Sequence, residues 1–132
     1  MAEKIPFDLV SPERLLLSDD AEMITLPGAE GDLGVLAGHE PLITTLRPGV
    51  IEVKGGGRGD ERFFVLGGFA DISPSKLTIL AEEAFPLASI NVADVDQRIA
   101  NAKEDLIGVK TDQERARLAA TLDALETLRG AL

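Results

Sequence analysis

Two acidic side chains and one histidine are the residues of this sequence whose types could support acid–base chemistry. Glu30 and Asp32 stand two positions apart in a glycine-rich segment, and His39 is the only histidine. Such groups act as general acid and base when a pocket shifts their pKa and a nucleophile or second base lies within reach. Nothing in the surrounding sequence indicates such a pocket. We therefore expect the two carboxylates in a solvated tight loop and His39 in a turn.

The glycines of the same segment suggest a phosphate-binding loop as the alternative. They are Gly28, Gly31, Gly34 and Gly38. Their spacing does not match Gly-x-x-x-x-Gly-Lys-Ser/Thr, and Arg14 is the only basic residue between Lys4 and Arg47. Turn glycines with positive φ explain the segment better. A metal site would need more ligands than one histidine, and the lack of cysteine excludes thiolate ligands, so we expect no catalytic, cofactor or metal site in this segment.

The charge and hydropathy of the chain exclude several classes of partner. The formal net charge is −10 at pH 7, which opposes binding to nucleic-acid phosphates and to anionic lipid. No apolar stretch approaches the roughly 20 residues that a membrane span needs, and the first residues lack the apolar core of a signal peptide. The absence of cysteine suits a cytosolic protein. We expect no nucleic-acid partner, and a membrane only through other proteins.

The first two thirds of the sequence has the pattern of short strands. Ile5, Phe7 and Leu9 alternate with other residues at the period of a half-buried strand. Further short apolar runs, separated by Pro and Gly, lie at 23–26, 50–53, 63–66 and 77–80. The segment Gly55–Asp60 is a strong turn signal and predicts a flexible hairpin tip. Short strands punctuated in this way indicate an antiparallel sandwich or barrel. The only aromatic residues are five Phe, so its core must be mainly aliphatic.

The pattern changes to that of a helix near residue 91. Asn91 is a suitable N-cap, and Asp94 follows near the positive end of the helix dipole. Gly108 is a plausible stop. One helix face carries apolar residues at steps of four, three and four, namely Val95, Ile99, Ala102 and Leu106.

A second helix follows directly. Thr111 and Glu114 have the spacing of a capping box. The expected apolar face consists of Leu118, Leu122, Leu125 and Leu128. A short connection makes the two helices antiparallel neighbours. We therefore predict a β domain over 1–88 and an antiparallel helical hairpin over 89–132, whose Ala-rich stripe gains little on burial.

The segment from Pro27 to Gly49 resembles the signature of the epsilon-subunit family of F-type ATP synthases, whose mitochondrial counterpart is called delta. The shared dipeptides are Glu30-Gly31, Leu33-Gly34, Gly38-His39, Pro41-Leu42 and Pro48-Gly49. The stretches Phe7–Glu13, Gly67–Phe69 and Leu77–Ala81 are also similar to the family. The resemblance covers nearly the whole chain in order.

This resemblance implies a non-catalytic rotor subunit built as a two-sheet antiparallel β-sandwich followed by a helical hairpin. The family's sandwich lies near the bottom of the central stalk, binds the gamma subunit and sits on the polar loops of the c-ring. It couples proton-driven rotation to ATP synthesis at the cytoplasmic face of the bacterial inner membrane, as a peripheral protein. The expected interface residues are Glu30, Gly31, Asp32, His39, Pro41 and Leu42. Among them, His39 is expected to contact gamma, and the acidic pair the c-ring.

The family also implies two roles for the hairpin. In many members it extends towards the catalytic alpha and beta subunits and inhibits ATP hydrolysis, and in some it binds ATP through a motif like Ile/Leu-Asp-x-x-Arg-Ala. Here Asp96 fits this motif, but Ile99 stands where Arg is expected and Arg98 comes one residue early. One step rotates a helical side chain by about 100°. We therefore expect Asp96 and Arg98 to bind ATP weakly or not at all.

Two other classes of function are compatible with parts of the sequence. A nucleotide-sensing regulator that acts outside the complex would show measurable ATP binding by the isolated chain. A small enzyme on a β-sandwich would need a closed cluster of ionisable groups in a pocket.

The balance of three basic against four acidic residues over 111–132 disfavours strong electrostatic docking of the hairpin onto acidic segments of a partner.

Overall fold

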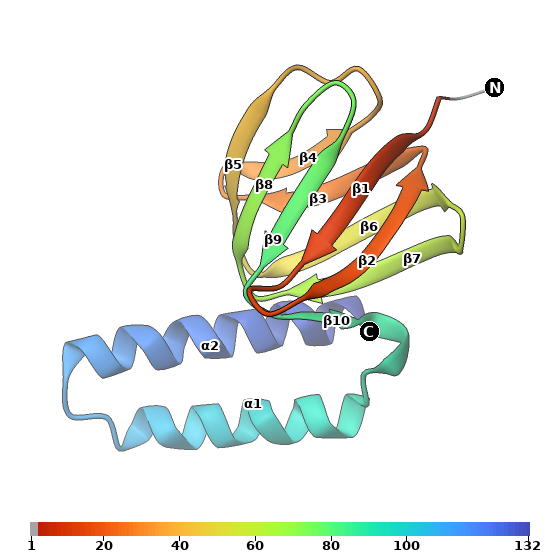
Figure 1. Cartoon of the computed structure of the whole chain (residues 1–132). Coiled ribbons are helices and arrows are strands. Elements are labelled where there is room, and N and C mark those ends of the chain that lie inside the picture. The colour runs from red at the N-terminus through yellow and green to blue at the C-terminus, as the bar shows by residue number, and fades with distance from the viewer. Residues whose placement is uncertain (1–2) are drawn as a thin grey trace. The chain divides into compact units, whose positions relative to one another are not determined.

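The computed structural model describes residues 3–132 and divides the chain into two compact units (Figure 1). The first unit ends at Leu87 and contains strands, and the second runs from Ala88 to Leu132 and contains helices. Residues 1–2, with which the predicted first domain begins, lie outside the described residues.

Ten strands build the first unit. They are β1 (Ile5–Val10), β2 (Leu15–Ala21), β3 (Met23–Gly28), β4 (Gly31–Val35), β5 (Leu42–Leu46), β6 (Gly49–Gly56), β7 (Gly59–Val65), β8 (Gly68–Ile72), β9 (Leu77–Ala81) and β10 (Ala84–Pro86). Their hydrogen-bonded order is β10-β7-β6-β3-β5-β8-β9-β1-β2, and β4 pairs with β3. A short 3₁₀ helix, Leu87–Ser89, follows them.

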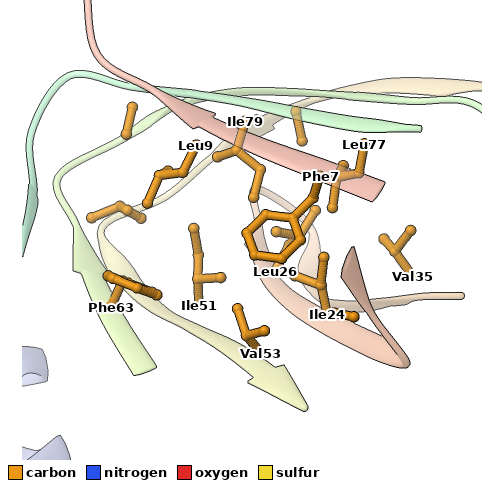
Figure 2. Close-up of a cluster of buried hydrophobic side chains, with 14 of the residues drawn as sticks. Phe7, Leu9, Ile24, Leu26, Val35, Ile51, Val53, Phe63, Leu77 and Ile79 are labelled. Carbon is orange, nitrogen blue, oxygen red and sulfur yellow. The ribbon is translucent and has the colours of Figure 1, made fainter. Parts of the chain in front are cut away.

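The sandwich closes around one apolar core, to which almost every strand contributes alternate side chains (Figure 2). Ile5, Phe7 and Leu9 are fully buried, as the alternation in the sequence predicted. Ile24, Leu26, Val35, Ile51, Val53, Phe63, Leu77 and Ile79 pack in the same cluster. Most of these residues are aliphatic, which confirms the prediction made from the shortage of aromatic residues.

The sequence predicted an antiparallel sandwich, and one pair of strands departs from this. β1 pairs with β9 in parallel, with Phe7 opposite Leu77 and Leu9 opposite Ile79. A parallel pair needs a long crossover connection. Here the intervening strands β2 to β8 supply it. The other pairings of the described strands are antiparallel.

Several strands were absent from the sequence prediction. β2 contains Asp19 and Asp20 in its interior, and β4 begins with Gly31 and Asp32. The expectation that Glu30 and Asp32 share a loop is therefore wrong for Asp32, which is a strand residue. Both strands form because a neighbouring strand satisfies their backbone groups, an effect that local composition does not reveal.

The glycine-rich tip between β6 and β7 is a hairpin turn with several side-chain anchors. Gly56 pairs with Gly59, and the Gly55 N–H donates to Asp60 Oδ1 at 2.9 Å. The Gly57 N–H donates to Asp19 Oδ1 on β2 at 3.2 Å. The sequence alone predicted a flexible tip and did not indicate this connection to β2.

The second unit is an antiparallel pair of helices, α1 (Val92–Ile107) and α2 (Asp112–Ala131) (Figure 1). Both predicted N-caps are confirmed. The Asn91 side chain accepts hydrogen bonds from the N–H groups of Ala93 and Asp94, at 2.8 and 3.4 Å. Thr111 Oγ1 accepts from the Glu114 N–H at 3.1 Å.

The buried stripe of the hairpin is narrow and contains small residues. Val95 and Ala102 of α1 and Ala124 and Leu128 of α2 are buried. The other predicted stripe residues, Ile99, Leu106, Leu118, Leu122 and Leu125, are only half-buried. A stripe of this kind gives the hairpin less hydrophobic stabilisation than the sandwich obtains from its core.

Gly68 generates a prediction about the sandwich. Its φ is +137°, and an added Cβ would lie 1.9 Å from the Leu80 carbonyl oxygen. We expect Gly68→Ala to lower the free energy of unfolding by about 3 kcal/mol or more, because strain and a backbone clash combine. Chemical denaturation of the isolated chain measures this change.

Gly34→Ala is the matched control. The nearest atom to its Cβ would be Met23 Sδ at 3.9 Å, an ordinary van der Waals distance. We expect a change within about 1 kcal/mol for this variant. Equal effects of the two substitutions would show that the close approach of β8 and β9 is wrongly described.

Candidate functional site

The acidic residues singled out in the sequence lie on the β3–β4 hairpin. Gly28 pairs with Gly31, which leaves Ala29 and Glu30 as a two-residue turn. Gly31 has φ of +140°, a conformation that favours glycine. The Glu30 side chain is exposed at the tip of the turn. Asp32, the second residue of β4, is also exposed. The hairpin thus presents both carboxylates to solvent at one end of the sandwich.

Arg47, which the sequence did not single out, binds this hairpin. It follows β5, and its guanidinium donates through Nη1 to the Gly28 carbonyl and through Nη2 to Asp32 Oδ1. The Arg47 backbone N–H also donates to the Pro27 carbonyl at 2.9 Å. Asp32 therefore has a cationic partner within the chain.

His39 lies in the connection between β4 and β5. Its Nδ1 is 2.7 Å from the Glu40 carbonyl oxygen, so Nδ1 carries the proton in this contact. The loop is also held by the Gly38 N–H, which donates to the Pro74 carbonyl at 2.9 Å. Pro41 is exposed beside it, and Leu42 begins β5 with 43% of its surface accessible. The geometry fits the turn residue expected from sequence.

The six predicted interface residues therefore form two separate groups. Glu30, Gly31 and Asp32 lie where β4 begins, whereas His39, Pro41 and Leu42 lie beyond its end. A strand of this length spans roughly 15 Å. The two groups can contact different partners, or different parts of one partner.

A third surface was missed by the sequence prediction. We call it the apolar outer face, and its residues are Val10, Leu15, Ile43, Phe69 and Leu80. They come from strands β1, β2, β5, β8 and β9, which lie in one layer (Figure 1). The alternation of side chains along β8 and β9 accounts for this surface. Ala70, next to Phe69, and Ile79 and Ala81, on either side of Leu80, are buried, so Phe69 and Leu80 face outwards.

Strand register places four residues of the apolar outer face in one row across the sheet, and Ile43 lies diagonally from Phe69, two positions before Thr45, the partner of Phe69 on β5. Phe69 is directly opposite Leu80, Leu80 is opposite Val10, and Val10 is opposite Leu15. Phe69, Leu80 and Leu15 are 52%, 40% and 56% exposed, and Ile43 is 72% exposed. Contiguous exposed apolar side chains mark surfaces that other molecules cover.

Two carboxylates of the sandwich have lowered pKa values. The hydrogen bond from Lys76, whose Nζ lies 2.9 Å from Asp8 Oδ2, lowers the pKa of Asp8, and Ser18 adds to this. The backbone N–H of Asp20, with those of Gly57 and Arg58, lowers the pKa of Asp19. Both shifts favour the ionised form. They indicate structural anchors, since acid catalysis near neutral pH requires a raised carboxyl pKa.

A groove of about 310 Å³ lies between the β1–β2 turn and the β9–β10 connection. It is lined by Ser11–Arg14, Leu16 and Glu82–Phe85. The Ser11 hydroxyl donates to the Arg14 carbonyl at 3.3 Å, so it serves the turn. Residues 3–132 contain no group of three metal-binding side chains. Neither helix of that range combines the length and apolar character needed to cross a bilayer.

The hairpin residues considered for ATP do not form a joint site. Arg129 Nε donates to Asp96 Oδ1 at 2.8 Å and ties the end of α2 to the start of α1. The Arg98 side chain is exposed and makes no hydrogen bond or ion pair with any described residue. Since Arg98 is two positions from Asp96, its side chain leaves the helix about 200° away.

Comparison with known proteins assigns the family. Residues 4–87 match the family model "ATP synthase, Delta/Epsilon chain, beta-sandwich domain". The chain belongs to the ATP synthase delta/epsilon family. A relative from Parvibaculum lavamentivorans, called "ATP synthase epsilon chain", is 50% identical over 129 residues, with 98% of each chain covered. A relative of the same name from Mesorhizobium japonicum is 48% identical over 132 residues, with all of this chain and 98% of the relative covered.

Solved structures share the fold of this chain. A chain of the Euglena gracilis mitochondrial ATP synthase, in a structure described as "OSCP/F1/c-ring in rotational state 1", has a TM-score of 0.85 and 28% identity. The alignment covers 97% of this chain and 81% of that one. A Tetrahymena thermophila mitochondrial ATP synthase chain shares the fold, with a TM-score of 0.69, 14% identity, and coverage of 98% and 97%.

The Asp96–Arg129 pair generates a prediction about ATP. We expect the isolated chain to bind ATP with a Kd weaker than about 1 mM, because Asp96 is already paired and Arg98 points elsewhere. Calorimetric titration measures the affinity, and Asp96→Asn is expected to leave the result unchanged. Tight binding that disappears in Asp96→Asn would contradict this account of the hairpin.

Proposed function

We propose that this chain is a non-catalytic subunit of the central stalk of a proton-translocating F-type ATP synthase. Its sandwich attaches to the gamma subunit and to the polar loops of the c-ring, and it couples c-ring rotation to ATP synthesis. Full-length similarity to relatives called "ATP synthase epsilon chain" supports this proposal. The observation that carries it is a sandwich with a continuous exposed apolar face and a separate acidic turn.

The apolar outer face fits attachment to gamma. Interface cores are apolar and aromatic, and Phe69 and Leu80 provide such a centre. Polar groups of the same layer surround it, including Asp8, which is held by Lys76, and Asp71. We assign the His39, Pro41 and Leu42 group to gamma as well, because the connection that carries it leads into β5, the strand that contributes Ile43 to the outer face, although the Leu42 side chain lies on the other side of that strand.

The acidic turn fits the c-ring. Glu30, Gly31 and Asp32 lie at the opposite end of β4 from the His39 loop, where they can meet basic side chains of polar loops. Two distinct contacts suit a subunit that must transmit torque, because one attachment point alone permits rotation about itself. The chain would then be peripheral, at the cytoplasmic face of the bacterial inner membrane.

The hairpin has a modest regulatory role in this proposal. It would approach the alpha and beta subunits and modulate ATP hydrolysis. The buried stripe of the hairpin contains small residues, and Asp96 and Arg129 pair with each other. Both features support weak docking onto alpha and beta, with a small electrostatic contribution. The same ion pair argues against a free nucleotide sensor, because it occupies the carboxylate that such a sensor would use.

Substitution of the apolar outer face tests the proposed attachment. We expect Phe69→Glu and Leu80→Glu each to weaken binding to ATP synthase depleted of this subunit by roughly tenfold or more, since a charge would be buried in the interface core. Binding can be measured by titrating the subunit back and following coupled ATP synthesis. Circular dichroism of each isolated variant monitors folding.

Ile107→Glu is the control for adding a charge at an exposed apolar position. Ile107 lies on α1 and is 87% exposed, outside the contact proposed between the sandwich and gamma. We expect this variant to bind like the unmodified chain. If the folded Phe69→Glu and Leu80→Glu variants also bind normally, the proposed face is wrong.

Deletion of residues 89–132 tests the role of the hairpin. The cluster that forms the sandwich core lies between Ile5 and Ala81, so we expect the truncated chain to fold. Coupled ATP synthesis should largely survive, and ATP hydrolysis by the assembled complex should rise by less than about threefold, because electrostatic docking of the hairpin is weak. A much larger release of hydrolysis would show that shape complementarity makes a strong inhibitory contact.

A further inference from the structure

Asp19 occupies a position on β2 where the alternation of the strand favours an apolar side chain. Leu17 and Ala21, two positions away on either side, are buried in the core. Asp19 lies directly opposite the buried Phe7 of β1, so it is on the core-facing side of β2. It is half-buried, whereas its neighbour Asp20 is exposed. A carboxylate in such a position costs free energy unless hydrogen bonds compensate it.

The glycine-rich tip between β6 and β7 supplies this compensation. Asp19 Oδ1 accepts hydrogen bonds from the Asp20 N–H at 2.8 Å and from the Gly57 N–H at 3.2 Å. The N–H groups of Asp20, Gly57 and Arg58 together hold the pKa of the Asp19 carboxyl below its usual range. Successive N–H groups of a turn make a concave site for an anion, and here the anion is a side chain of another strand.

The glycines of the tip leave room for two acidic side chains. A Cβ on Gly57 would lie 2.7 Å from Asp19 Oδ1, and one on Gly56 would lie 3.1 Å from Asp19 Oδ2. A Cβ on Gly55 would lie 2.5 Å from Cγ of Glu22. Gly57 has no positive φ, so its contact with Asp19, and not its backbone conformation, disfavours a larger residue there.

This contact joins two parts of the sheet that lie far apart in the hydrogen-bonded order. Among the described strands, β2 pairs only with β1, at one end of the order, whereas β6 and β7 lie near the other end. β2 and β6 are nevertheless in contact (Figure 1). Where the chain turns from β2 into β3, the Glu22 N–H donates to the Lys54 carbonyl at 2.9 Å. We call this junction of β2 with β6 and the β6–β7 tip the seam.

We propose that Asp19 and the Gly55–Arg58 tip form a clasp that closes the seam and keeps the free edge of β2 from pairing with a strand of a second copy of this chain. An edge strand presents unpaired N–H and C=O groups that can template such pairing, and an inward-pointing charge opposes it. The tip compensates this charge only while the seam is closed. The role does not depend on attachment to ATP synthase, and it goes beyond the proposed function.

Asp19→Val and Asp20→Val are the matched pair that tests the clasp. Both add the same apolar residue to β2, but only the first removes the carboxylate that the tip binds. Amide hydrogen exchange of the full chain is measured by NMR at Gly57, at Glu22 and at Ala70 in the middle of β8. Ala70 lies away from the seam and serves as the internal reference.

We expect exchange in Asp19→Val, relative to Ala70, to rise about tenfold or more at Gly57 and about threefold or more at Glu22. The Glu22 amide does not touch Asp19, so its response reports opening of the seam and not the loss of one hydrogen bond. Asp20→Val should leave both ratios unchanged.

Gly57→Ala opens the clasp from the other side and leaves β2 unaltered, so it also carries the test if Asp19→Val does not fold. Its Cβ would displace the Asp19 carboxylate, and we expect faster exchange at Glu22. In an Asp19→Ala chain the same Gly57→Ala substitution should add nothing, because residues that act through one contact are not additive.

Self-association tests the protection of the β2 edge. Sedimentation of the full-length variants measures it, and we expect Asp19→Val to associate about tenfold more tightly than Asp20→Val, since both have the same added apolar surface. Three results would overturn the inference. They are normal exchange at Glu22 in Asp19→Val, additive effects of Gly57→Ala and Asp19→Ala, and equal self-association of the two valine variants.

Discussion

The alternation of side chains along the strands is the constraint on which the rest of the sandwich depends. Residues such as Phe7, Leu26 and Ile79 enter a single core, and each one fixes the opposite direction for its neighbours. A shift of one residue in any strand would expose that strand's core residues. The same rule that buries Ala70, Ile79 and Ala81 therefore places Phe69 and Leu80 on the outside. Strand register thus decides where the apolar outer face lies.

The hairpin turn and the outer face illustrate two ways of presenting a contact. On the outer face the sheet itself supplies rigidity, so apolar side chains need no further support. At the β3–β4 turn, hydrogen bonds from Arg47 to Gly28 and Asp32 add to the pairing of Gly28 with Leu46 of β5. The unit of two helices depends on caps and one ion pair, with a buried stripe of small residues. Stability thus falls from the core of the sandwich to its turns, and is modest in the hairpin.

The parts of the fold that could be predicted are those with a strong local signal. Regular alternation of apolar residues predicted β1, and the N-cap residues Asn91 and Thr111 predicted where the two helices begin. Strands β2 and β4 were missed because Asp19 and Gly31 have poor strand propensity, and pairing with a neighbour decides their conformation. Family resemblance supplied the candidate interface residues. No local pattern showed that these residues divide into two groups. The pairs Arg47–Asp32 and Arg129–Asp96 join residues that are distant in sequence, so no local pattern contains them either.

The parallel pairing of β1 with β9 has a consequence for how the chain is made. Phe7 meets Leu77 only after about seventy residues have been synthesised between them, although β1 can pair with β2 almost at once. Closing so long a loop is slow, and contacts of high sequence separation delay folding. Until β9 emerges from the ribosome, one edge of β1 remains open to other strands. The order of synthesis therefore favours completion of the sandwich late in translation, and a nascent chain that stalls before residue 77 would expose an unpaired strand edge and the core side chains that β9 covers.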